Sequence, residues 1–123
     1  MLNLDTHILV FALSGNLTAT ERKVLAAEKW SISDIVFWEL SMLIQRGRID
    51  LDLTDPAVAR VLAELQVWPI TLEIANTIND LDFDSDPADE LIAATSPPPL
   101  HHNIPLVTRD SRIRKSKIVP LAL

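Results

Sequence analysis

The sequence predicts an α/β protein with a parallel sheet covered by helices on both faces, in a single domain spanning residues 1–123. Short apolar runs typical of strands alternate with segments of helical periodicity, and strands separated by helices pair in parallel. The length of 123 residues suits one domain, and no repeat or long linker divides it. The apolar share of 48% supplies a core, while the absence of Cys excludes disulfide bonds and thiolate metal sites.

Five short apolar runs are the expected strands of the sheet. They lie at residues 2–5, 30–33, 67–71, 105–108 and 118–121. Pro69 falls inside the third run and favours an edge position for it, because proline cannot donate a hydrogen bond to a neighbouring strand. The sheet should therefore have about five strands.

The segments between these runs are the expected helices. They lie at residues 6–13, 20–29, 35–46, 56–65, 72–81 and 87–94. Glycines end two of them, Gly15 the first and Gly47 the third. Asp-Pro pairs, at residues 55–56 and 86–87, begin two others, since Asp is a preferred N-cap and proline suits the first helical position.

Two acidic residues follow expected strands at their carboxyl ends, where open parallel sheets form their sites. Asp5 ends the first run, and Asp110 comes two residues after the fourth. Ordinary structural roles remain open for both: Asp5 as a helix N-cap and Asp110 as a turn residue.

Two further acids lie on the apolar faces of expected helices. The helix neighbours of Glu39 at three and four positions on either side are all apolar, and Asp89 shares a face with the apolar residues three and four positions later. A buried carboxylate is costly unless it is paired or bound to a cation. For Glu39 the structural alternative is a salt bridge to Arg46 or Arg109, and for Asp89 it is interaction with the helix dipole.

Four carboxylates brought to one place repel one another unless a cation lies among them. Hard oxygen ligands favour Mg²⁺ or Mn²⁺. Such a site supports phosphodiester hydrolysis by activating water and holding the phosphate.

The net charge of −6, from 11 basic and 17 acidic side chains, argues at first against a nucleic-acid partner. The charges are unevenly spread, however, with six acids between residues 80 and 90 and five bases between residues 109 and 117. Without the four candidate site acids the balance is 11 bases to 13 acids, or −2. The excess is therefore largely one acidic site, beside which the basic run could attract phosphate.

The remaining features favour a cytoplasmic protein without a membrane partner. No apolar run approaches the roughly 20 residues of a membrane span, and the amino terminus lacks the pattern of a signal peptide. The three tryptophans, Trp30, Trp38 and Trp68, lie in or beside apolar segments, so we expect them in the core.

Four blocks of the sequence, in order, resemble the PIN domain, and most closely the VapC-type toxins of type II toxin–antitoxin systems. They are residues 2–7 (LNLDTH), 38–40 (WEL), 86–95 (DPADELIAAT) and 105–110 (PLVTRD). The resemblance implies a three-layer α/β/α fold and a Mg²⁺- or Mn²⁺-dependent endoribonuclease that cuts RNA. It also implies a homodimer, neutralised by a cognate VapB-like antitoxin whose C-terminal segment lies over the active site.

The same resemblance assigns the family's acidic quartet to four positions of this chain. The catalytic and metal-binding residues would be Asp5, Glu39, Asp89 and Asp110, with Asp86 at an auxiliary acidic position.

Three prolines at residues 97–99 depart from the family's pattern and resemble an insertion. Because proline disrupts a helix, the helix that carries Asp89 should end by about Thr95. The alternative function is therefore a catalytically impaired PIN-like interaction protein. His101 and His102 follow in the same loop, where we expect them to be solvated rather than bound to metal.

Overall fold

The structure is a computed structural model of the chain and describes residues 1–97 and 104–123. Its parallel sheet has four strands in the described residues: β1 (Leu2–Leu4), β2 (Trp30–Ser33), β3 (Gln66–Trp68) and β4 (Leu106–Val107). Their order across the sheet is β3-β2-β1-β4. The chain thus builds outward from β1 in one direction and then returns to the other side of β1, so strand order reverses between β1 and β4.

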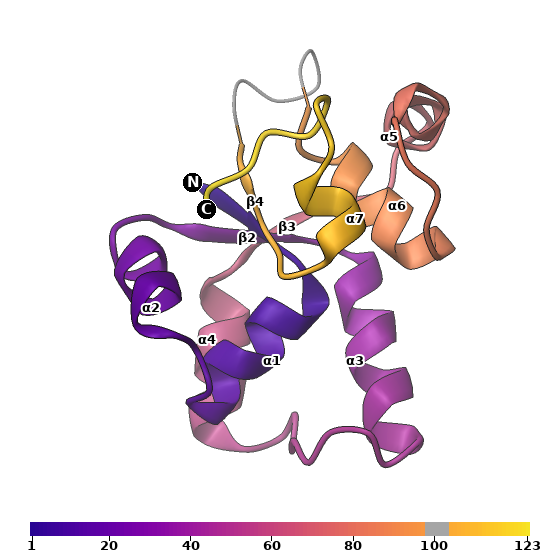
Figure 1. The fold of residues 1–123 in the computed structure, drawn as a ribbon. Helices are drawn as coiled ribbons and strands as arrows, with labels where there is room; N and C mark the ends of the chain where they lie inside the picture. The colour runs from indigo at the N-terminus through magenta and orange to yellow at the C-terminus, as the bar shows by residue number, and fades with distance from the viewer. Residues whose placement is uncertain (98–103) are drawn as a thin grey trace.

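The helices form the layers on either side of this sheet. They are α1 (Thr6–Ser14), α2 (Ala19–Ala26), α3 (Ile35–Gln45), α4 (Pro56–Glu64), α5 (Leu72–Thr77), the 3₁₀ helix η1 (Ile78–Asp80), α6 (Pro87–Ala94) and α7 (Ser111–Arg114). Figure 1 shows α1, α3 and α4 on one side of the sheet and α5, α6 and α7 on the other. The predicted three-layer α/β/α architecture is confirmed.

Two of the helix-capping residues predicted from the sequence, Asp55 and Gly15, act as caps in the structure. Asp55 accepts a hydrogen bond from the amide of Ala57, 2.8 Å away, at the start of α4. Gly15 ends α1 with a φ of 75°, a left-handed conformation in which other residues are strained. The edge position predicted for the third strand is confirmed, but β3 ends at Trp68, so Pro69 lies just beyond the strand and not inside it.

The strand expected at residues 118–121 is reduced to one parallel bridge between Leu121 and Leu106. The amide of Leu106 donates to the carbonyl of Pro120, and the amide of Ala122 donates to the carbonyl of Leu106. Pro120 itself has no amide hydrogen to extend the pairing. The segment therefore follows the edge of β4 without becoming a strand.

The core lies on both faces of the sheet. Ile8 and Leu9 of α1, Ile32 of β2, Leu40 of α3 and Ile92 of α6 have no exposed side-chain surface. Burial of this apolar surface is the main force that holds the layers together.

The expectation that all three tryptophans are core residues is wrong for Trp38, which is 56% exposed. The buried stripe of α3 runs through Val36 and Leu40, and Trp38 lies halfway between them along the helix, away from that stripe. Trp30 and Trp68 are half-buried.

The helix α6 ends at Ala94 and is capped by Thr95, as the prolines that follow predicted. Of the proposed insertion, Pro98 and Pro99 lie outside the described residues, as do His101 and His102. Within residues 1–97 and 104–123, none of the helices has the length and apolar character needed to cross a membrane.

Candidate metal-binding site

The carboxyl ends of β1 and β4 meet where the strand order reverses, and this junction places two of the four acids. Asp5 follows β1 and Asp110 follows β4 by three residues. The two strands pair in parallel, with Leu4 opposite Val107, and the amide of Asp5 donates to the carbonyl of Val107 over 3.1 Å. The sheet pairing therefore brings the two segments that carry these acids side by side.

Asp5 is the most buried of the four, with 6% of its surface exposed. Its Oδ1 accepts from the amide of Thr6 over 2.8 Å, and its Oδ2 accepts from the hydroxyl of Thr108 over 2.7 Å. Burial raises the pKa of Asp5 above its usual range, and the negative charge of Asp110 raises it further. Asp5 is thus both the N-cap of α1 and a buried carboxylate at the strand end, so the two roles considered for it coincide.

Glu39 projects from α3 toward the start of α1, where its Oε1 accepts a hydrogen bond from the hydroxyl of Thr6. Burial raises its pKa, as do the charges of Asp89 and Asp5. None of the ion pairs within the described residues involves Glu39. Arg109, one of the two partners considered for it, is instead bonded to Glu21.

Asp89 lies in the first turn of α6 and is half-buried, with its Oδ2 accepting from the hydroxyl of Ser85 over 3.1 Å. Burial raises the pKa of Asp89, followed by the charge of Asp5 and, more weakly, those of Asp110 and Asp86. Asp86 occupies the N-cap position of α6, but its side chain makes no capping hydrogen bond and is exposed. The auxiliary acid therefore adds negative charge near Asp89 without serving as a cap.

Asp110 is the N-cap of α7, and its Oδ1 accepts from the amides of Arg112 (2.8 Å) and Ile113 (3.3 Å). Its Oδ2 lies 3.8 Å from the guanidinium of Arg112. The structural role considered for Asp110 is therefore present, and the same residue also raises the pKa values of Asp5 and Asp89.

A buried side chain holds α6, and with it Asp89, against the central strand. Asn3 of β1 is fully buried, and its Nδ2 donates to the carbonyl of Ile92 (3.0 Å) and to the hydroxyl of Ser96 (2.9 Å). These bonds join segments about ninety residues apart in sequence. They fix α6 relative to β1, and therefore Asp89 relative to Asp5.

Each of the four predicted acids interacts electrostatically with at least one of the others, which supports their convergence on one site. In the part of the chain that the structure describes, no three Asp, Glu or His side chains are grouped closely enough to hold a metal ion. Their oxygens are turned instead into hydrogen bonds with Thr6, Thr108, Ser85 and the start of α7. As a donor set, four carboxylates, of which Asp5, Glu39 and Asp89 have raised pKa values, fit a hard divalent cation, whose charge would relieve their repulsion.

Two threonines next to the acids prove to be their hydrogen-bond partners. Single hydroxyls such as those of Thr6 and Thr108 are common in any sequence and indicate a site only weakly. Each follows an expected strand or lies at its end, within two residues of an acid. Ser85 donates a hydrogen bond to Asp89. Nothing in the sequence indicated this role except that Ser85 lies four residues before Asp89.

The arginines of the basic run are engaged with the protein itself rather than free beside the site. Arg109 bonds Glu21, and Arg112 lies near Asp110 and donates to the carbonyl of Asp84. Arg114 donates to the carbonyl of Thr108 over 3.2 Å. Each of these three arginines therefore has a partner within the protein, while the side chains of Arg109 and Arg112 stay 40% and 56% exposed.

The sequence profile of the PIN domain family matches residues 3–118. The chain belongs to the PIN domain family. A search of curated proteins found no match.

Several solved structures share the fold, among them the two that follow. One is from a toxin–antitoxin complex of Klebsiella pneumoniae, with 20% sequence identity and a TM-score of 0.66, covering 94% of this chain and 91% of the other. The second is from the VapBC2 complex of Rickettsia felis bound to a DNA fragment from its promoter, with 18% identity and a TM-score of 0.68, covering 98% and 97%. At these identities the likeness establishes the fold, in agreement with the family assignment.

Proposed function

We propose that this PIN domain is a Mg²⁺- or Mn²⁺-dependent endoribonuclease and the toxin of a toxin–antitoxin pair. The observation that supports the proposal is the electrostatic interaction among four carboxylates near the switch point of the sheet, where burial and the neighbouring acids raise the pKa values of Asp5, Glu39 and Asp89. The family is generally nucleolytic and metal-dependent, and both structural neighbours come from toxin–antitoxin complexes, which supports the same activity here.

We infer the role of each of the four acids from its surroundings. Asp5 and Asp89 would hold the principal cation, with Glu39 and Asp110 completing the acidic ring. The cation would activate water and neutralise charge on the scissile phosphate. Thr108 orients the Asp5 carboxylate by donating to it, and Thr6 does the same for Glu39.

Cleavage of RNA by the purified protein tests the proposal. We expect cleavage with Mg²⁺ or Mn²⁺, none with EDTA, and a loss of at least about a hundredfold in Asp5→Asn, because a principal ligand is removed. Asp84→Asn is the matched control, since Asp84 is an exposed acid outside the quartet. Equal cleavage by Asp5→Asn and the wild type would contradict the proposal.

We also propose that the active form is a homodimer. Four exposed apolar side chains support it: Phe37 and Trp38 of α3, Ile70, and Leu72 of α5, which is 86% exposed. A hydrogen bond from the amide of Ile70 to Asp34 Oδ2 (3.2 Å) holds the β3–α5 connection against the start of α3. Large exposed apolar side chains of this kind are typical of protein interfaces.

Light scattering after gel filtration tests this dimer. Leu72→Ser combined with Trp38→Ser should shift the mass from dimer toward monomer. The control is Ile118→Ser, another exposed apolar residue (44%) outside this set. A monomeric wild type, or an unchanged dimer in the double variant, would refute this use of the surface.

The antitoxin is the third part of the proposal. A net charge of −6, concentrated at the acidic site, favours a partner segment with basic side chains over the site. The RNA substrate and the antitoxin would both be met in the cytoplasm, where we propose that the chain acts. Expression of the chain alone should arrest growth through cleavage of RNA. Co-expression with the cognate VapB-like antitoxin should relieve this growth arrest and abolish the RNA cleavage.

One observation favours the second candidate, a PIN-like interaction protein without activity. The four acids are engaged in hydrogen bonds, and no three of them are grouped for a cation within the described residues. Metal titration separates the two candidates. A rise in melting temperature with Mn²⁺ that Asp89→Asn abolishes supports the nuclease, whereas an unchanged melting temperature with antitoxin binding intact supports the interaction protein.

A further inference from the structure

We propose that Arg109 and Glu21 form a positioning pair that holds the turn after β4, and through it Thr108 and Asp110, in place at the acidic site. The site is the one in the proposed function, on which this inference rests. Arg109 lies between Thr108 and Asp110 in the sequence, so contacts that fix its side chain also restrict the backbone positions of both neighbours.

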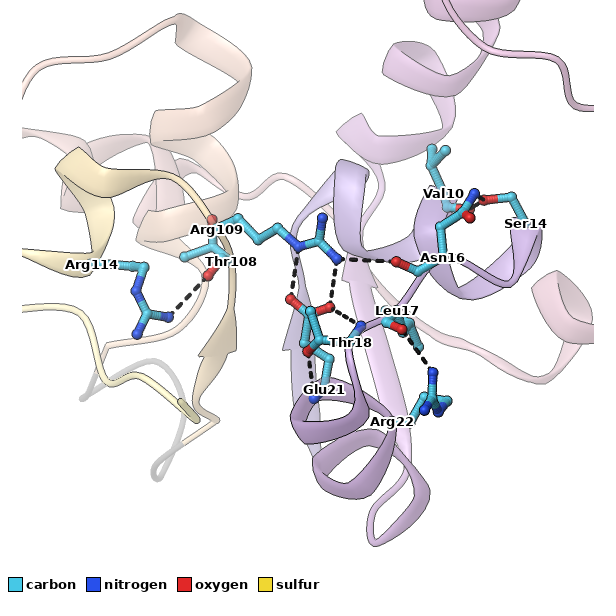
Figure 2. Close-up of polar contacts among 10 residues, drawn as sticks. All are labelled: Val10, Ser14, Asn16, Leu17, Thr18, Glu21, Arg22, Thr108, Arg109 and Arg114. Atoms are coloured by element: carbon cyan, nitrogen blue, oxygen red, sulfur yellow. Dashed lines mark hydrogen bonds and ion pairs between the residues drawn. The ribbon is translucent and has the colours of Figure 1, made fainter.

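The contact between the two side chains is bidentate (Figure 2). Arg109 Nε donates to Glu21 Oε2 over 2.8 Å, and Nη2 donates to Glu21 Oε1 over 2.6 Å. Nη2 also lies 3.2 Å from the carbonyl oxygen of Asn16, and the guanidinium carbon lies 3.9 Å from the centre of the Phe11 ring. The side chain is thus held by α1, by the α1–α2 connection and by α2, in the geometry that makes arginine pairs strong.

Glu21 is a fixed anchor for this contact. Its side chain is 6% exposed, and its Oε1 also accepts from the amide of Thr18 over 2.8 Å. The Thr18 hydroxyl accepts from the amide of Glu21 in return, which completes a capping box at the start of α2. Arg109 holds the pKa of Glu21 at about 2, so the carboxylate keeps its charge at any physiological pH.

The turn needs such an anchor because the sheet alone holds it weakly. The strand β4 has only two residues, Leu106 and Val107. Beyond it, the Thr108 hydroxyl donates to Asp5 and accepts from the amide of Asp110 over 3.1 Å. Thr108 therefore faces the site while Arg109 reaches α2, and the two side chains brace the turn from opposite sides.

The same contacts argue against Arg109 as a ligand for the RNA backbone. Two of its three nitrogens already donate to Glu21 and Asn16. Binding phosphate would require breaking a charge-assisted pair whose other member is buried, which costs more than a surface contact returns.

Hydrogen exchange measured on the full chain tests the pair without reference to activity. In Glu21→Gln, which can still accept from the Thr18 amide, exchange at the amides of residues 108–110 should rise about tenfold while exchange in α6 stays unchanged. The matched control is Leu25→Val, which destabilises the same helix through a buried side chain that is not part of the Glu21–Arg109 pair. Equal exchange in the two variants would refute the pair.

Mn²⁺ binding by calorimetry gives the functional readout. Glu21→Gln should bind Mn²⁺ about tenfold more weakly, the size of effect seen when a support behind metal ligands is removed, and Leu25→Val should bind like the wild type. Arg109→Lys keeps the charge but not the bidentate fork, so its affinity should be intermediate. An unchanged Mn²⁺ affinity in Glu21→Gln would overturn the role at the site.

The two proposals can fail separately. A wild type that binds no Mn²⁺ and cuts no RNA would refute the nuclease, while faster exchange of the turn in Glu21→Gln would still support the positioning pair. Conversely, suppose that the wild type cuts RNA while Glu21→Gln changes neither the amide exchange of residues 108–110 nor the Mn²⁺ affinity. That result would support the nuclease and refute the positioning pair.

Discussion

The ion pair between Glu21 and Arg109 should make the stability of the fold depend on pH in a defined way. Glu21→Gln removes the negative charge but keeps the side-chain shape and the acceptor for the Thr18 amide. The difference between wild type and variant therefore reports chiefly on the pairing with Arg109.

The expected size follows from the pKa of Glu21, which Arg109, with smaller contributions from Thr18, lowers from 4.5 to about 2. Unscreened, this corresponds to about 3 kcal/mol at neutral pH. The Arg109 side chain is 40% exposed, however, so solvent screening reduces the expected loss to about 1–2 kcal/mol. Because the pKa of the folded state is the lower one, this stabilisation is complete above pH 4.5 and declines as the pH falls toward 2.

Urea unfolding of both proteins at pH 7, 5 and 3.5 measures this loss. We expect Glu21→Gln to be less stable by about 1–2 kcal/mol at pH 7, or roughly 4 to 8 °C in melting temperature. By pH 3.5 the gap should shrink by roughly a third to a half. Glu28→Gln is the control, because Glu28 pairs with the amino terminus at an exposed site and should cost at most about 0.5 kcal/mol. A gap that stays constant from pH 7 to pH 3.5, or is absent at pH 7, would refute the reasoning.

Three further outcomes are expected. Asn3→Ala should lower the free energy of unfolding by about 2–3 kcal/mol, measured with urea, because two buried hydrogen bonds are lost, although the Ile92 carbonyl still accepts from the amide of Thr95. In EDTA at pH 8, Asp5→Asn should melt at a higher temperature than the wild type, because burial raises the pKa of Asp5 and its charged form opposes folding. This difference in melting temperature should diminish as the pH falls through the raised pKa of Asp5. A difference that grows as the pH falls would contradict the prediction. Ile32→Val should cost about 1 kcal/mol in the same urea assay while leaving the Mg²⁺-dependent cleavage rate within about twofold of the wild type, because Ile32 is a core residue outside the acidic ring.

The elements that the sequence predicted well are those set by neighbouring residues. The Asp-Pro start of α4 and the Gly15 end of α1 depend on backbone requirements within a few residues. Periodicity likewise placed Glu39 on a partly buried face of α3. Trp38 was misplaced because apolar character does not reveal which side of a short helix the rest of the fold covers.

The prediction of a strand at residues 118–121 was wrong for a related reason. Residues 118–121 have the apolar composition of a strand, but Pro120 and the short β4 beside it leave only one bridge. Whether an apolar run becomes a strand depends on the hydrogen-bonding partners that the sheet offers, and these come from distant parts of the chain.

By itself, the sequence determined the fold class and the positions of most helix caps, and it nominated the four acids, because these inferences depend on local periodicity, capping and composition. Only the tertiary structure decided what holds those acids: Thr108 on Asp5, Thr6 on Glu39, and the pairing of Arg109 with Glu21. Those contacts join residues 33 to 103 positions apart, and such partners are chosen by the packing of strands and helices. The net charge suggested the basic run as a binding surface for RNA. In the structure its three arginines contact groups of the protein itself: Glu21, Asp84, Asp110 and Thr108.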